Sequence, residues 1–147
     1  MITTPEELLD YVHDYIDSRK GELGIAYVAY GEEDLLPEYP AVIVTAEPVN
    51  RDLHGTHTFG ITLELSIWVL HANLDVSRRQ RTREDLLLVT GIRNLLHGNL
   101  RLYDPDTNEP NVIHAYVSAE VPGTVVRKSD AIVATRMSYT ATTQARF

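Results

Sequence analysis

His54 and His57 are the residues of this sequence that come closest to a metal-binding motif. They are separated by Gly55 and Thr56, and their imidazole nitrogens are of the type that binds zinc. A zinc site needs further protein ligands, and no third ligand can be identified from the spacing. We expect an exposed polar turn with no bound metal, and a small metal-dependent enzyme using His54 and His57 is the alternative from a different functional class.

The segment from Asp104 to Asn108 resembles the first half of a calcium-binding loop, because oxygen-bearing side chains alternate along it. Glu109, however, occupies the place of the required glycine, and Ala115 occupies the place of the bidentate acid. The segment is therefore predicted to be a solvated turn.

No catalytic motif is recognisable in the chain. It contains no glycine-rich phosphate loop, no GxSxG and no HExxH, and its six histidines are not spaced with an acid and a nucleophile in any familiar way. The absence of cysteine excludes disulfides, thiolate metal sites and cysteine nucleophiles, and is consistent with a reducing compartment. We expect a protein that is not an enzyme and has no cofactor, although a site assembled only in space would escape this reasoning.

The strongest charge feature is an arginine segment, which consists of Arg78, Arg79, Arg81 and Arg83. These arginines stand in the first turns of a predicted helix, where the helix dipole mildly disfavours cations. One interpretation is a solvated face, and the other is a contact with an acidic neighbour or with nucleic acid. No aromatic residues alternate with the arginines, and the chain is acidic overall, so we expect no sequence-specific binding of nucleic acid.

The acidic residues are concentrated at the other end of the chain. Residues 1–40 hold ten acids against two bases, whereas the remaining residues hold eleven of each, so the first 40 residues carry the whole net charge of −8. Separate acidic and basic regions on one chain favour contact between copies of that chain. As acidic partners of the arginine segment we expect Glu32 and Glu33, which are chosen from this region without a geometric argument.

The chain is organised around a long predicted strand, Phe59–Ala72. Its odd-numbered positions from Phe59 to Val69 are all apolar, which predicts one continuous apolar face. Trp68 and Leu70 fall on the opposite face, which either a helix or another subunit must cover. We expect Trp68 to lie at or near a subunit contact.

Two helices are predicted around this strand. The first begins with a cap at Thr4 and a capping box to Glu7, and Gly21 is expected to end it. The second begins at Ser77 and ends before Gly98, with the buried stripe Leu88, Val89, Ile92, Leu95 and Leu96.

Three more strands are predicted, and they cover Ala41–Glu47, Val112–Val121 and Ala131–Thr142. Pro122-Gly123 is expected to end the second of these. Residues 25–30 form either a short strand or an extended segment. The loop over residues 49–58 is predicted to reach towards a partner, with Arg51, Asp52, His54 and His57 facing it.

The predicted organisation is a single α+β domain over residues 1–147 in the order α-β-β-α-β-β. It consists of an N-terminal helix (1–21), an acidic connector (22–39), and a sheet with the second helix (40–147). The sheet is expected to be long and mainly antiparallel, with helices packed on one face. The acidic start is unlike a signal peptide, and no apolar run approaches a membrane span, so we expect no membrane association.

The whole chain resembles the tail terminator (tail completion) proteins of long-tailed, siphovirus-type phages in its size and its order of elements. The local sequences that carry this resemblance are Tyr39–Val44, the strand Leu63–Val69 with its tryptophan, and the helix Glu84–Leu96 after an arginine-rich start. Proteins of this family form a hexameric ring that caps the finished tail tube and offers a surface to the head connector.

The resemblance implies a virion structural protein whose partners are itself, the tail tube protein and the head–tail connector proteins. It implies a place at the head-proximal end of the tail, with assembly in the host cytoplasm, and it implies no catalytic residue. A neck or head-completion protein of the same virus is the alternative within this class.

Overall fold

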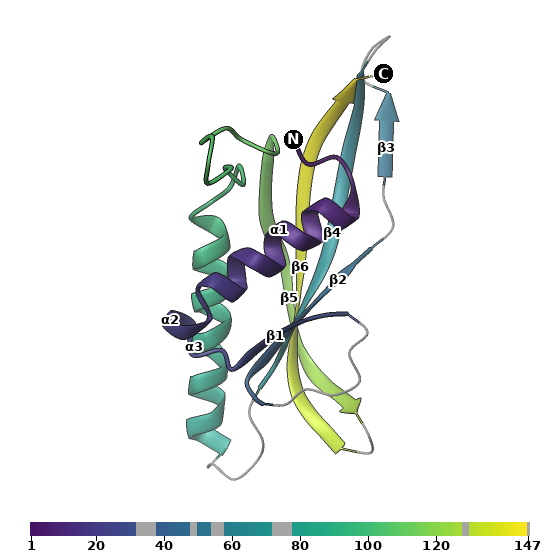
Figure 1. Ribbon diagram of the computed structural model, residues 1–147. Helices are drawn as coiled ribbons and strands as arrows, with labels where there is room; N and C mark the ends of the chain where they lie inside the picture. The colour runs from purple at the N-terminus through teal and green to yellow at the C-terminus, as the bar shows by residue number, and fades with distance from the viewer. Residues whose placement is uncertain (32–37, 48–49, 54–57, 72–77, 128–129, 147) are drawn as a thin grey trace.

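The computed structural model describes residues 1–31, 38–47, 50–53, 58–71, 78–127 and 130–146. The elements in chain order are α1 Pro5–Ser18, α2 Lys20–Leu23, β1 Tyr27–Tyr30, β2 Ala41–Ala46, β3 Asn50–Leu53, β4 Thr58–Leu70, α3 Arg78–His97, β5 His114–Arg127 and β6 Asp130–Arg146. The fold is α+β, as predicted, with a sheet of long strands and two main helices (Figure 1).

The described strands form one sheet of six strands in the order β1-β2-β4-β6-β5, with β3 also paired to β4. Only β1 and β2 run parallel, and every other pair is antiparallel. β4 pairs with β6 over its full length, from Thr58 opposite Arg146 to Leu70 opposite Ala134. The long central strand therefore has a long partner, as its length required.

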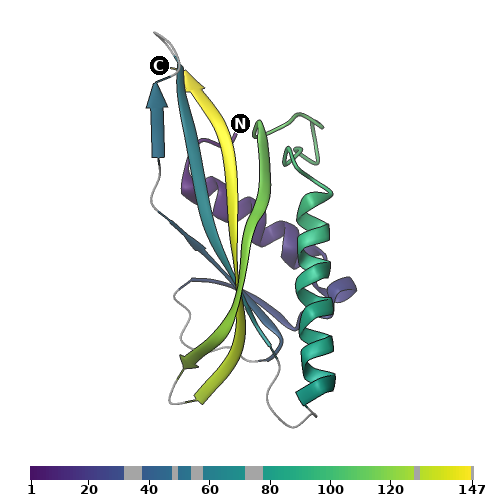
Figure 2. The same cartoon turned by 180° about the vertical axis from the view of Figure 1, so that it is seen from behind.

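Both main helices pack on the same face of the sheet. Figures 1 and 2 show α1 crossing the sheet obliquely on one side, with α3 beside it. The apolar stripe of β4 from Ile61 to Val69 is buried there with residues of both helices. The helix residues buried in this main core are Leu8, Val12, Ile16, Val89, Ile92 and Leu96. The alternation of β4 and the stripes of the two helices thus meet in one core, as predicted.

The start of α1 is confirmed and its predicted end is wrong. The Thr4 hydroxyl accepts a hydrogen bond from the Glu7 backbone N–H at 3.3 Å and caps the helix. α1 ends at Ser18, and Gly21 lies inside the short helix α2. Gly24, with φ of 75°, follows α2 and takes the left-handed conformation that glycine adopts without a Cβ clash. The predicted connector 22–39 thus contains part of α2 and the strand β1.

Two strand predictions are corrected by the sheet. β2 pairs with β4 only from Leu65 to Leu70, and β3 pairs with the free edge that β4 leaves at Phe59–Thr62. Asn50–Leu53 is therefore a strand and not part of a loop. β5 continues through Pro122, because it is an edge strand and an edge strand tolerates the missing N–H of proline.

Candidate functional site

Trp68 lies on the side of the sheet opposite the two main helices, as the alternation of β4 predicted. It is partly buried beside a second apolar cluster drawn from β1, β2, β4 and β6. The buried members of this cluster are Ala29, Ala41, Ile43, Leu70 and Ala134. We call this side, with Trp68 and the second cluster, the Trp68 face. In the part of the chain that the structure describes, no long helix packs on it.

A polar network fixes the surroundings of Trp68. Arg136, its partner across the β4–β6 pair, places its guanidinium carbon 5.7 Å from the centre of the Trp68 ring. Arg136 Nε donates a hydrogen bond to Ser66 Oγ at 3.0 Å, and Ser66 Oγ donates to Glu47 Oε1 at 2.7 Å. Cation–π contacts of this kind contribute about 0.5–1 kcal/mol at exposed sites. Contacts within the chain thus hold the Trp68 ring in place, and the polar groups around it are satisfied.

The structure places the arginine segment in the first turns of α3, as predicted, and Arg83 is exposed there. It describes the backbone of Arg78, Arg79 and Arg81 but not their side chains. Glu32 and Glu33 lie outside the described residues, so their pairing with the arginine segment stays a prediction.

The loop predicted over residues 49–58 is shorter than expected, because strand β3 takes up residues 50–53. Arg51 and Asp52 belong to β3, where they pair with Ile61 and Gly60. His54 and His57 lie outside the described residues. Among the residues that the structure does describe, no group of three or more histidines and acids is placed to hold a metal ion.

Asp104 closes the turn that resembles half a calcium loop. Its Oδ1 accepts hydrogen bonds from the backbone N–H groups of Asp106 at 2.8 Å and Thr107 at 3.1 Å, which lowers the pKa of its carboxyl group. The residues from Pro105 to Asn108 are exposed, so this segment is the solvated turn that the sequence predicted.

A buried histidine pocket was missed by the sequence analysis. His71 directly follows β4 and is only 1% exposed. Its Nε2 lies 3.0 Å from Thr135 Oγ1 on β6, and its Nδ1 lies 3.2 Å from Asp85 Oδ1 on α3. The second contact is close enough for an ion pair but is not aligned as a hydrogen bond. At the end of β4, His71 therefore contacts both the neighbouring strand β6 and the helix α3.

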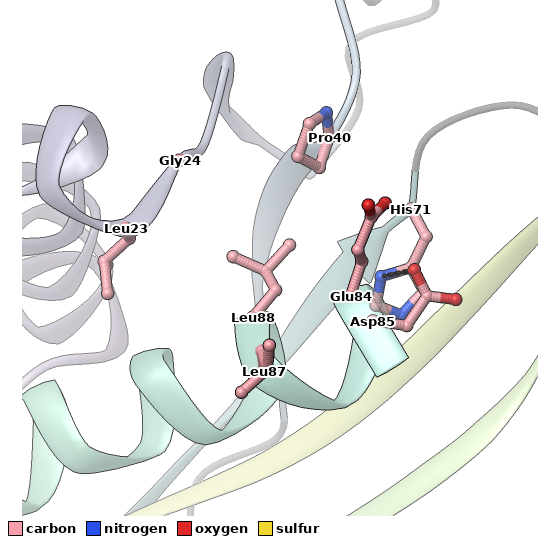
Figure 3. Close-up of a pocket in the computed structure, with 8 residues that line it drawn as sticks. All are labelled: Leu23, Gly24, Pro40, His71, Glu84, Asp85, Leu87 and Leu88. Atoms are coloured by element: carbon pink, nitrogen blue, oxygen red, sulfur yellow. Dashed lines mark ion pairs between the residues drawn. The ribbon is translucent and has the colours of Figure 1, made fainter. Parts of the chain in front are cut away.

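The pocket beside His71 has a volume of about 360 Å³ (Figure 3). Leu87 and Leu88 of α3 line it together with Pro40, and Asp85 lies against the His71 ring. Thr135 is buried and does not line the pocket, so the Asp85–His71–Thr135 series presents no nucleophile to a ligand there. We interpret the three side chains as a polar link between α3 and the sheet.

A signal for His71 was present in the sequence. His71 is odd-numbered, like the apolar residues of β4, so the alternation of a strand places it on the face that the helices cover. Asp85 precedes Val89, Ile92 and Leu96 at spacings of four, seven and eleven residues, which places it on the buried stripe of α3. The contact between the two residues could not be predicted, because the pairing of α3 with β4 is a tertiary property.

We expect His71 to make the folded protein less stable in acid. Burial lowers the pKa of His71, while the charge of Asp85 opposes this shift. As the pH falls below about 6.5, the unfolded chain therefore binds a proton that the folded protein resists. The histidine should thus contribute a loss of stability of at most about 1.4 kcal/mol per pH unit in that range.

The measurement is urea denaturation at a series of pH values for wild type and His71→Gln. The curve of stability against pH should be flatter for His71→Gln between pH values of about 6.5 and 5. The control is His114→Gln, which removes an exposed histidine of the edge strand β5 instead of the buried one. Parallel curves for wild type and His71→Gln would show that burial of this ring is not linked to protonation.

Comparisons with known proteins identify no relative: no protein-family model matches the chain, and no curated protein matches its sequence. Within the described residues, no helix has the length and apolar character needed to cross a membrane. The function proposed below therefore rests on the surfaces of this chain and on its resemblance to the tail terminator proteins.

Proposed function

We propose that this chain is a virion structural protein that forms a homo-oligomeric ring, hexameric by resemblance, at the head-proximal end of a phage tail. The ring caps the tail tube and joins it to the head connector. It carries out no catalysis and needs no cofactor. The observation that carries this proposal is the Trp68 face, where a partly exposed tryptophan lies on the side of the sheet that the two main helices do not cover.

The composition of the Trp68 face supports a protein contact. Tryptophan and arginine are enriched in the centres of protein interfaces, and residues of this kind dominate binding energy when they fill a pocket on the partner. Here the guanidinium of Arg136 lies over the Trp68 ring, and Ser66 and Glu47 accept hydrogen bonds from that guanidinium. A partner can therefore cover the tryptophan without leaving an unpaired charge in the interface.

A second surface on the same subunit supports assembly in a ring. β5 is an edge strand, and the side chains of Ile113, just before it, and of Tyr116 and Val121, within it, are exposed. The β5–β6 hairpin also extends beyond the other strands at one end of the molecule (Figure 2). A subunit with two different contact surfaces can bind its neighbours head to tail, and such contacts form a ring when the rotation between neighbours closes.

The test combines sedimentation velocity with electron microscopy of the purified protein, alone and mixed with purified tail tubes. We expect ring-shaped particles of one size, and tubes that carry a ring at one end and no longer elongate. A protein that stays monomeric even in the presence of tube ends would refute the proposal. Binding to head connector particles but not to tubes would identify a neck protein instead.

A further inference from the structure

We propose that a tyrosine pocket on α1 receives the arginine segment of the next subunit, an inference that rests on the proposed ring. The tyrosine pocket is a cavity of about 520 Å³ between α1 and the segment that follows α3. The lining residues that matter here are Tyr11, Asp14, Tyr15, Arg19, Asn99 and Tyr103.

The walls of the tyrosine pocket are held by hydrogen bonds between distant parts of the chain. The Tyr11 hydroxyl donates to the backbone oxygen of Tyr103 at 2.6 Å and accepts from Asn99 Nδ2 at 2.9 Å. The rings of Tyr11 and Tyr15 lie 6.1 Å apart between centres. Tyr103 is 40% exposed, so part of its side chain remains open to a partner. The pocket is therefore formed within one subunit and does not need a ligand to assemble it.

The chemistry of the tyrosine pocket selects a cation. Aromatic faces attract a guanidinium group, which can also stack on them. Asp14 lines the pocket with a side chain that is 77% exposed and lies 3.0 Å from His13 Nδ1, and Asp10 precedes it by one turn of α1. Among the described residues that line the pocket, Arg19 is the one base, and its Nη1 lies 3.4 Å from Glu22, which offsets its charge. An arginine of a partner thus meets both aromatic rings and negative charge.

The arginine segment of the same subunit cannot fill the pocket. Asn99 and Tyr103 follow the last turn of α3, whereas the arginine segment forms its first turns. A helix of 20 residues is roughly 30 Å long, so the arginine segment and the chain segment that follows α3 lie at opposite ends of this helix (Figure 1). The contact must therefore form between subunits, and the two surfaces differ, which is the head-to-tail arrangement of a ring. The tyrosine pocket is an acidic partner whose geometry is described, whereas the pairing of the arginine segment with Glu32 and Glu33 stays a prediction.

The experiment uses two full-length variants with opposite defects. One carries Arg79→Glu with Arg83→Glu, and the other carries Asp14→Asn with Tyr103→Ala, which leaves the backbone oxygen of Tyr103 in place. Each variant alone should associate about fivefold to tenfold more weakly than wild type in sedimentation velocity. Mixed in equal amounts, the two should form a dimer at concentrations at which each variant alone stays largely monomeric, because one intact pocket still meets one intact arginine segment.

The control Glu6→Gln removes one acidic charge from exposed α1 surface outside the pocket and should assemble as wild type does. Thermal melts by circular dichroism verify that each variant is folded. The inference is overturned if the pocket variant assembles like wild type, or if the mixture gives no more dimer than either variant alone at the same total concentration. In either case, if the wild-type protein still forms rings, the proposed function is not contradicted and only the pocket is excluded as the contact.

A separate titration tests the pocket if wild type forms no ring, which is the result that refutes the proposed function. A synthetic peptide of residues 78–85 is added to the full chain while the tyrosine resonances are followed by NMR. Shifts of Tyr11, Tyr15 and Tyr103 that are lost in the Asp14→Asn, Tyr103→Ala variant support the pocket as an arginine site. The absence of such shifts overturns it.

Discussion

Replacing Trp68 with alanine should weaken each contact between subunits of the proposed ring by about 2 kcal/mol or more, which is roughly 30-fold in the association constant. The ring of Trp68 is held in place by Arg136 and lies beside an apolar cluster. A partner that covers this ring buries its apolar surface without the entropic cost of ordering the side chain. Its removal also takes away the aromatic ring over which the Arg136 guanidinium lies.

The matched control is Glu64→Ala, because Glu64 lies on the same strand and the same side of the sheet as Trp68 and is exposed. Sedimentation velocity over a dilution series measures both variants, and thermal melts separate a weaker ring from a weaker fold. If Trp68→Ala and Glu64→Ala assemble equally well, the Trp68 face is not the subunit contact.

Replacing Leu65 with alanine should lower the free energy of unfolding by about 2–5 kcal/mol. Leu65 is buried in the main core under the helices, in the middle of β4, where β2 and β6 pair with it on both sides. The neighbouring strands hold the backbone in place, so the surrounding side chains cannot move in to fill the cavity that the substitution leaves. The loss would therefore include the cavity as well as the transfer of the side chain.

Urea denaturation of the monomer measures this effect, again with Glu64→Ala for comparison. Glu64 is the neighbour of Leu65 in the chain but points to the other side of the sheet and is exposed, so its replacement should change stability by less than about 0.5 kcal/mol. A similar loss of stability in both variants would contradict the assignment of the two faces of β4.

Elements whose signals are local could be predicted from the sequence alone. Thr4 predicted the start of α1, because an N-cap acts on residues three positions away. The alternation along β4 predicted which side of the sheet is buried and placed Trp68 on the other side, because successive side chains of a strand point to opposite faces. The buried stripe of α3 was predicted in the same way from its helical period.

Other features depended on which strands become neighbours. The continuation of β5 through Pro122 depends on its position at the edge of the sheet. The strand at Asn50–Leu53 forms because β4 extends past β2 and leaves an unpaired edge. A local pattern cannot report either fact, since both depend on which part of the chain pairs with which.

The candidate sites show the same division. The sequence analysis located the arginine segment at the start of a helix but gave it no partner supported by geometry, and it missed His71, although the alternation of β4 carried a signal for it. Asp85 and Thr135 meet His71 only because α3 and β6 both pack against the end of β4. The tyrosine pocket joins Tyr11 to Asn99 and Tyr103, which lie far along the chain from it. These contacts depend on the fold and could not be predicted from local sequence patterns. Hydrogen bonds and packing act between groups that are close in space, whatever their separation in the sequence.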